Sequence, residues 1–273
     1  MASSSPDPSL SPQRTAVSSE QKWPDVIWIV RHGQSAGNVA REAAEAAANP
    51  LIDITWRDMD TPLSELGEQQ ARALGRWFAQ MPEHERPTVI LCSPYVRARE
   101  TARIVAETAG IDRDVVPCQS DERLREKEFG SLDRLTKFGI KQKFPDLAEQ
   151  RAHVGKFYFR PPGGESWCDV ILRLRSMLDT ITREHRRERL LVVGHQVIVN
   201  CYRYLLERLD EAAILEIDRV ADVPNCSVTS YEFDPGAGRN GKLVPRLVNF
   251  TAPLEAAGAP ITAAPDVPAA PKS

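Results

Sequence analysis

Two apolar segments, far apart in the chain, each run directly into a histidine. Residues 26–30 are followed by Arg31 and His32, and residues 190–194 are followed by His195. Short unbroken runs of β-branched and other apolar residues are typical of strands that are buried on both faces of a parallel sheet. Ligands bind such sheets at the carboxyl edge of the strands. The two segments therefore predict two histidines and an arginine at one sheet edge, which favours chemistry on an anion.

Helical patterns separate these strands from the others that the sequence predicts. Strands are expected at 26–30, 88–91, 115–117, 190–193, 228–233 and 243–250. Helices are expected at 36–48, 64–81, from Ser93-Pro94 to Gly110, at 133–144, at 165–185 and from His195 to Glu207. Because strands alternate with helices, the chain is predicted to form an α/β fold, a three-layer α/β/α sandwich with a mostly parallel central sheet.

The two ends of the chain differ in composition from its middle. Residues 1–22 are rich in Ser and Pro, and residues 252–273 are rich in Ala and Pro, with few apolar side chains. Such segments bury too little apolar surface to offset the entropy of ordering, so both are predicted to be disordered tails. Residues 23–251 are then expected to form a single catalytic domain of ordinary size.

Charge and cysteine content argue against a nucleic-acid binder, a membrane-surface binder and a disulfide-bonded secreted protein. The chain has 35 basic and 38 acidic residues, a net charge of −3, which argues against a dedicated nucleic-acid or membrane-surface binder. Its five cysteines are scattered and include no CxxC, which favours reduced thiols in a cytoplasmic protein. No stretch approaches the roughly 20 apolar residues of a membrane span, and the N-terminus lacks the apolar core of a secretory signal. Oligomeric state is not predicted.

Other motifs are weak or absent. Residues 236–241 match GxGxxG, but they follow Asp234-Pro235 and precede a strand pattern, so a hairpin turn is predicted there. The sequence contains no GxxxxGK[ST] phosphate loop, no HExxH zinc motif and no EF-hand loop. No metal and no cofactor are therefore expected.

The paired histidines favour phosphoryl transfer. A neutral imidazole can attack phosphorus and hold the phosphoryl group until water removes it, provided that cations surround the equatorial oxygens. Arg31 supplies one such cation, and its planar fork suits phosphate. Arg97 supplies a second from the first turn of the predicted helix opened by Ser93-Pro94, where backbone N–H groups also favour an anion. Arg99 should point away from that face and be solvated.

At this point the residues resemble a known family, the histidine phosphatase (phosphoglycerate mutase-like) superfamily. The resemblance rests on six blocks in family order, which span most of residues 26–250: Arg31-His32-Gly33-Gln34-Ser35 with Asn38, residues 62–71, residues 93–102, residues 124–130, residues 161–166, and Gly194-His195. The resemblance implies the same α/β/α sandwich.

The resemblance also implies roles for five residues. His32 matches the nucleophile that becomes phosphohistidine, and Arg31, Arg97 and His195 match the pocket that binds the phosphoryl group. Glu126 matches the general acid/base. From the sequence pattern alone, Glu122 and Glu128 would be equally good candidates for that last role.

A second set of residues is expected to contact substrate. Asn38 matches a family contact on the substrate side, and the backbone N–H of Gln196 should complete the phosphate pocket. Arg160 and the Gln196 side chain resemble contacts to a second phosphate or a sugar. Gln34 and Lys127 complete this set, and Lys127 stands where phosphoglycerate mutases have arginine.

The resemblance is nearest to the phosphatase branch, and within it to the fructose-2,6-bisphosphatase domain. Only 69 positions separate Glu126 from His195, too few for the basic insertion of the cofactor-dependent mutases. Gly163 and Asn200 replace a lysine and an arginine of the bisphosphatase, which argues against assigning its substrate. The predicted function is hydrolysis of a small phosphate monoester. Two alternatives stay open: mutase-type phosphoryl transfer, and a noncatalytic protein that binds a phosphorylated ligand.

Overall fold

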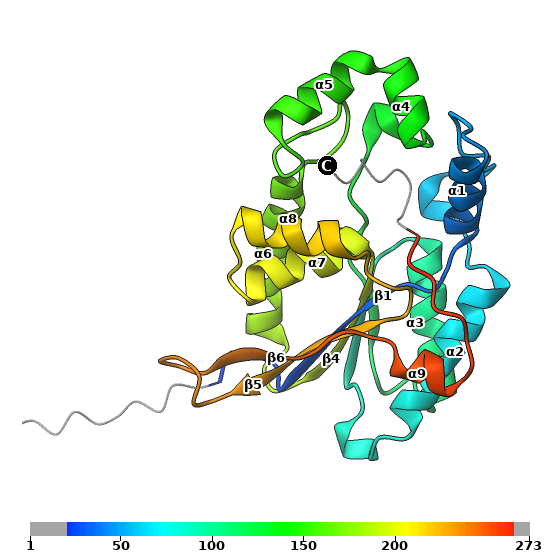
Figure 1. The fold of residues 1–273 in the computed structure, drawn as a ribbon. Helices are drawn as coiled ribbons and strands as arrows, with labels where there is room; N and C mark the ends of the chain where they lie inside the picture. The colour runs from blue at the N-terminus through cyan, green and yellow to red at the C-terminus, as the bar shows by residue number, and fades with distance from the viewer. Residues whose placement is uncertain (1–20, 265–273) are drawn as a thin grey trace, which may run out of the picture.

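A six-stranded mixed sheet organises residues 21–264, the part of the chain that the computed structural model describes (Figure 1). The strands are β1 (Val26–Arg31), β2 (Val89–Cys92), β3 (Cys118–Ser120), β4 (Arg189–Gly194), β5 (Val228–Asp234) and β6 (Lys242–Phe250). Their order across the sheet is β3-β2-β4-β1-β5-β6. β1 pairs in parallel with β4, as do β4 with β2 and β2 with β3, whereas β5 runs antiparallel to β1 and β6. The predicted mostly parallel sheet is confirmed.

Helices cover both faces of this sheet (Figure 1). They are α1 (Ala36–Ala46), α2 (Glu65–Ala79), α3 (Val96–Ala109), α4 (Lys137–Lys143), α5 (Pro145–Val154), α6 (Trp167–Glu184), α7 (Gln196–Leu206), α8 (Glu211–Val220) and α9 (Ala252–Ala256). Successive side chains of a strand point to opposite faces, so β1 contributes to two cores. Ile27 and Ile29 pack with α6 and α7 in one core, and Trp28 and Val30 pack with α2 and α3 in the other. The α/β/α sandwich predicted from the sequence is therefore confirmed.

Two glycines bring the start of α2 against the loop that follows β1. A Cβ on Gly67 would lie 2.0 Å from the backbone oxygen of Gln34, and one on Gly33 would lie 2.4 Å from the oxygen of Gly67. Only glycine permits backbones to approach this closely. This contact fixes the position of Gly33 and Gln34, the two residues that follow His32.

Several element boundaries differ from the predictions. The predicted strand at 115–117 is a turn, because the N–H groups of Val115 and Val116 both donate to Asp112 O, and the strand forms at β3 instead. The helix predicted to begin at Pro94 begins two residues later, at Val96, with Tyr95 as its N-cap. Helix α4 begins at Lys137, where the Thr136 hydroxyl accepts from Gly139 N. Helices α5 and α8 were not predicted.

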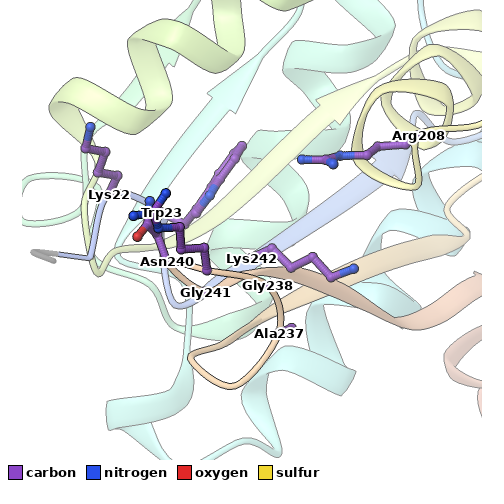
Figure 2. Close-up of a pocket in the computed structure, with 9 residues that line it drawn as sticks. Lys22, Trp23, Arg208, Ala237, Gly238, Asn240, Gly241 and Lys242 are labelled. Atoms are coloured by element: carbon purple, nitrogen blue, oxygen red, sulfur yellow. The ribbon is translucent and has the colours of Figure 1, made fainter.

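The turn between β5 and β6 contains the GxGxxG sequence, and the predicted hairpin is confirmed. Asp234 and Lys242 pair at the end of this hairpin, and residues 237–242 line a pocket (Figure 2). The pattern therefore belongs to a strand connection rather than to a dinucleotide fold.

The prediction of a disordered tail from residue 252 onward is wrong for residues 252–264. Helix α9 packs Leu254, which is fully buried, into the core beneath α2. Beyond it, Gln70 Nε2 donates to Pro260 O and to Thr262 Oγ1, each at 2.9 Å, and Asn225 N donates to Thr262 O at 2.8 Å. These hydrogen bonds order residues 260–262, although the composition of the segment predicts disorder. Predictions for residues 1–20 and 265–273 lie outside the described residues.

Within residues 21–264, no helix is both long and apolar enough to cross a bilayer.

Candidate active site

The two histidines meet at the carboxyl edge of the sheet, as predicted. β1 and β4 are neighbours, and their register pairs Arg31 with Gly194, the last residue of each strand. His32 N donates to Gly194 O at 2.9 Å, which continues the strand pairing by one residue. Both histidines are fully buried, and their ring centroids lie 5.1 Å apart. We call the buried side chains of Arg31, His32, Arg97 and His195 the rim site.

The hydrogen bonds of the His32 ring select one tautomer. Nδ1 lies 2.7 Å from the oxygen of Gly33, which can only accept, so Nδ1 carries the proton. Arg97 Nε lies 3.2 Å from Nε2 of His32 and can only donate, so Nε2 carries a lone pair. Both contacts require neutral imidazole with its nucleophilic nitrogen at Nε2.

Arg97 reaches His32 from the first turn of α3 and is 2% exposed. Its Nη1 donates to the backbone oxygen of Asp58 at 2.6 Å and lies 3.0 Å from the carboxylate Oδ1 of the same residue. Asp58 begins the short 3-10 helix η1 (Asp58–Asp60). The ion pair itself was not predicted, since no local pattern links positions 58 and 97. Arg99 is exposed, as predicted.

Tyr95 and Ser93 complete the surroundings of His195. The Ser93 hydroxyl lies 2.8 Å from His195 Nε2, so Ser93 orients the imidazole rather than capping a helix. The Tyr95 ring packs edge-on against the His195 ring at 5.1 Å and lies 5.0 Å from the Arg97 guanidinium carbon. Burial, with the nearby carboxylates of Asp58 and Glu128, raises the pKa of Tyr95, so its hydroxyl is neutral. Neither residue was predicted to belong to the site.

Arg31 is fully buried and is held by two distant segments. Its Nη1 donates to Val223 O and its Nη2 donates to Ala264 O, both at 2.6 Å. Asn38 Nδ2 also donates to Ala264 O, at 3.2 Å, while its Oδ1 accepts from Ser35 N at 2.9 Å. The C-terminal segment, predicted to be a tail, therefore contacts two predicted site residues.

Glu126 is distinguished from its neighbours by burial. It is 1% exposed, whereas Glu122 and Glu128 lie at the surface. Its Oε1 accepts from the backbone N–H of Lys127 at 2.7 Å. The structure thus favours Glu126 among the three carboxylates that the sequence pattern left open.

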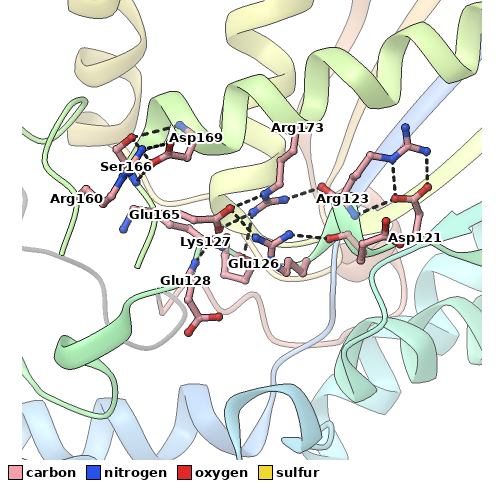
Figure 3. A network of polar contacts seen from close by, with 12 residues as sticks. Asp121, Arg123, Glu126, Lys127, Glu128, Arg160, Glu165, Ser166, Asp169 and Arg173 are labelled. Carbon is pink, nitrogen blue, oxygen red and sulfur yellow. Dashed lines mark hydrogen bonds and ion pairs between the residues drawn. The ribbon is translucent and has the colours of Figure 1, made fainter. Parts of the chain in front are cut away.

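A polar network fixes the backbone around Glu126 (Figure 3). Arg173 Nη2 donates to Glu126 O at 3.2 Å, and its Nε donates to Glu165 Oε1 at 3.0 Å. Glu165 also accepts from Arg125 Nη2 at 2.7 Å and from Glu128 N at 3.0 Å. Although burial opposes it, hydrogen bonding by Arg173 lowers the pKa of Glu165. The ionised Glu165 therefore joins α6 to the segment that carries Glu126.

Lys127 is also buried, with 8% of its surface exposed. Its ammonium lies 4.4 Å from the centroid of the Phe129 ring, a cation–π geometry. Burial lowers the pKa of Lys127 to about 8, even though Glu126 and Glu165 oppose this shift.

The remaining predicted substrate contacts are engaged with protein groups. Arg160 is mostly exposed and pairs with Asp169 in the first turn of α6, with Nε to Oδ2 at 2.8 Å. The Gln34 side chain accepts from Ser64 Oγ at 2.7 Å, and Gln196 Nε2 donates to Asp222 Oδ1 at 2.7 Å. The structure thus gathers the rim site but does not bring these three side chains into it by any contact described.

Within residues 21–264, no three side chains of His, Cys, Asp or Glu gather as a metal site would require.

Comparison with known proteins identifies the family. The model of the histidine phosphatase superfamily (branch 1) matches residues 27–243. A 2,3-bisphosphoglycerate-dependent phosphoglycerate mutase 2 of Gloeobacter violaceus is 30% identical over 81% of this chain and 91% of its own length. The 6-phosphofructo-2-kinase/fructose-2,6-bisphosphatase of Caenorhabditis elegans is 30% identical over 79% of this chain but only 43% of its own length. A mycobacterial glucosyl-3-phosphoglycerate phosphatase, solved with inorganic phosphate, is 22% identical and superposes with a TM-score of 0.61, covering 84% of this chain and 99% of that one. The chain belongs to the histidine phosphatase superfamily.

Proposed function

We propose that this chain hydrolyses a small phosphate monoester through a phosphohistidine intermediate on His32. The observation that carries the proposal is the tautomer of His32, whose Nε2 lone pair faces Arg97 inside a buried cluster of cations and imidazoles. Family membership supports the same activity. Burial matters because electrostatic stabilisation of a phosphoryl group is much stronger where water is excluded.

The first step forms a bond between His32 Nε2 and phosphorus and breaks the bond between phosphorus and the ester oxygen. Arg97 exchanges its hydrogen bond to Nε2 for one to a phosphoryl oxygen, and Arg31 and His195 contact the other oxygens. Glu126 donates a proton to the leaving alkoxide, which departs as an alcohol.

The second step reverses the role of Glu126. The carboxylate removes a proton from water, and the water oxygen attacks phosphorus as the phosphorus–Nε2 bond breaks. Inorganic phosphate leaves, and the imidazole returns to the neutral tautomer that the Gly33 contact favours. No proton or electron is left unaccounted for, so the cycle needs only water as a co-reactant.

The test is mass spectrometry of the full chain, quenched at neutral pH during turnover of p-nitrophenyl phosphate. We expect a phosphoryl group on His32 in the wild type, and loss of both the adduct and hydrolysis in His32→Ala. His153→Ala is the control, because His153 lies on α5 outside the rim site. Hydrolysis that survives in His32→Ala would overturn the covalent mechanism.

One second function is favoured by a specific observation, the 30% identity to a bisphosphoglycerate-dependent mutase. A mutase would return the phosphoryl group from His32 to a second hydroxyl of the substrate rather than to water. Conversion of 3-phosphoglycerate to 2-phosphoglycerate, stimulated by 2,3-bisphosphoglycerate and faster than phosphate release, would replace the phosphatase proposal. A noncatalytic role would require that neither phosphate nor isomer appear with any of a panel of sugar phosphates.

The bisphosphatase substrate is not supported. Asn200, which replaces an arginine of that enzyme, donates to Asp218 Oδ1 at 3.3 Å. Asp218 in turn pairs with Lys156. Asn200 therefore contacts a carboxylate that is already paired with Lys156, and it brings no positive charge where that enzyme has an arginine, which disfavours a substrate with two phosphates.

We also propose a cytoplasmic location. All five cysteines are free thiols, and Cys92, Cys201 and Cys226 are buried. Unpaired thiols in this number are typical of reducing compartments. Cell fractionation with an antibody to the chain tests the location, and recovery in an oxidising compartment would contradict it.

A further inference from the structure

Figure 2 shows a second pocket, which lies beside the start of β1, whereas the rim site lies beside its end. It has a volume of about 660 Å³ and is lined by Lys22, Trp23, Arg208, residues 237–241 and Lys242. Lys22 and Trp23 precede the first residue of β1, whereas His32 follows its last. A six-residue strand rises roughly 20 Å, so the two sites are separated by about that distance. We call this second site the basic pocket.

Four cations line the basic pocket and no carboxylate does. They come from three separate segments: Lys22 from the chain before β1, Arg208 from the turn between α7 and α8, and Arg239 and Lys242 from the β5–β6 hairpin. In a chain of net charge −3, this is an uneven distribution of charge. Figure 2 shows Arg208 extending its guanidinium toward the ring of Trp23.

Carboxylates close to these cations in the sequence contact other groups, and Glu207, next to Arg208, pairs with Arg203 Nε at 2.9 Å. Asp25 accepts from Gln21 Nε2 at 2.7 Å, Asp210 caps α8 by accepting from Ala213 N at 2.8 Å, and Asp234 accepts from Gly236 N at 2.8 Å. Many other surface arginines pair with a carboxylate, as Arg219 does with Glu216 and Arg246 with Glu232.

None of the four lining cations forms an ion pair with another residue of the described range 21–264. Like charges that line one pocket repel one another, and a bound anion relieves that repulsion.

Trp23 adds a flat apolar surface beside these charges. It is half-buried, packs in part against the core of α6 and α7, and lines the pocket. Its backbone oxygen accepts from Arg187 N at 3.1 Å, which holds it in place. The pocket volume lies within the range of small-molecule sites. Arginines and lysines recognise phosphate oxygens, and an indole stacks on a planar base.

We propose that the basic pocket binds a nucleoside triphosphate. The charge of such a ligand, about −4 at neutral pH, matches the four lining cations. Its phosphates contact Arg208 and Lys242, and its base packs against Trp23. The site is independent of the proposed phosphatase activity, because none of its lining residues belongs to the rim site.

The test is calorimetric titration of the full chain with the hydrolysis-resistant 5′-adenylyl imidodiphosphate. In the double variant Arg208→Ala/Lys242→Ala we expect affinity to fall about tenfold, since two exposed charge contacts are lost. The control double variant Arg219→Ala/Arg246→Ala removes the same net charge from paired surface residues and should bind as the wild type does. Phosphatase turnover should be unchanged in both double variants.

Two further titrations are needed. The first tests whether the analogue binds at the basic pocket or at the rim site, and the second tests whether its base contributes to the affinity. Arg97→Ala, which disables the rim site, should still bind the analogue. Trp23→Leu should weaken the analogue about threefold and leave inorganic tripolyphosphate unaffected. The proposal is overturned if binding disappears in Arg97→Ala but survives in Arg208→Ala/Lys242→Ala, if the control loses as much affinity, or if Trp23→Leu weakens both ligands equally.

Discussion

The two edges of the sheet hold positive charge in opposite ways. At the rim site, Arg31 and Arg97 are at most 2% exposed, and each has its guanidinium held by backbone oxygens. At the basic pocket, Lys22, Arg208 and Lys242 are exposed and unpaired within the described range. Burial and fixed partners preorganise the first set for a developing charge, whereas solvent screens the second. This difference agrees with the two proposals, catalysis at the rim site and binding without catalysis at the basic pocket.

The strongest test of this contrast is removal of a rim cation. Arg97→Ala should lower kcat for p-nitrophenyl phosphate on the order of 10²–10³-fold, because a transition-state contact is lost in a dry site. Arg99→Ala is the matched control, since Arg99 lies two residues away on the exposed face of α3. Steady-state kinetics of both variants measure the effect. Equal losses in the two variants would remove the distinction between buried and exposed cations.

Burial of the Lys127 ammonium should destabilise the folded chain, and this effect should depend on pH. Its pKa falls from 10.5 to about 8 on folding, so the unfolded chain binds its proton more tightly between these values. Below about pH 8, burial of the charged ammonium lowers the free energy of unfolding by about 3 kcal/mol. This loss of stability disappears as the pH rises to about 10.5.

Lys127→Met should therefore unfold at a higher temperature than the wild type at pH 7, and its advantage should vanish by about pH 10.5. Thermal unfolding measured across this range tests the expectation, with exposed Lys22→Met as a control that should show no such trend. A constant advantage at every pH would mean that packing, not charge, sets the difference.

Asp58 allows the positioning of Arg97 to be tested separately, because Asp58 holds the Arg97 guanidinium but is not one of the proposed reacting groups. Asp58→Asn keeps the backbone oxygen that Arg97 Nη1 contacts but removes the carboxylate charge. We expect kcat to fall about tenfold with little change in KM, and Asp58→Glu to recover part of the loss. Asp60→Asn, whose carboxylate pairs with exposed Arg57, should have no effect. An unchanged kcat in Asp58→Asn would show that the backbone contact suffices.

The smallest expected effect concerns the C-terminal segment. Thr262→Val removes the hydroxyl that accepts from Gln70 Nε2 and donates to Asn225 Oδ1 at 3.0 Å. Ala264 should then hold Arg31 less firmly, and KM should rise about threefold. Thr251→Val, which removes a hydroxyl contact to exposed Glu255, is the control. A fall in KM would instead mean that the Ala264 oxygen competes with substrate.

The sequence predicts those parts of the site that local patterns determine. Arg31 and His195 lie where apolar strands end, and Arg97 lies in the first turn of a helix, so three of the rim residues follow from position along an element. Asp58 contacts Arg97 and Ser93 contacts His195, and no periodic pattern in the sequence indicates either contact. The local sequence pattern does not distinguish Glu126 from Glu122 and Glu128; the family resemblance selects Glu126, and of the three only Glu126 is buried.

The missed elements have physical causes as well. Helix α5 has no buried side chain, so it shows no amphipathic period. The ordered segment up to residue 264 depends on hydrogen bonds to Gln70 and Asn225, which composition does not reveal.

The contact between Arg31 and Ala264 spans 233 positions of the chain. The pairing of β1 with β4 is similarly remote, so no early fragment of the polypeptide contains the rim site. His32 is therefore synthesised long before Val223 and Ala264, whose backbone oxygens accept from its neighbour Arg31. Contacts of such high sequence separation form late and slowly in folding. Chains truncated before Val223 should therefore carry His32 without the phosphatase activity proposed for it.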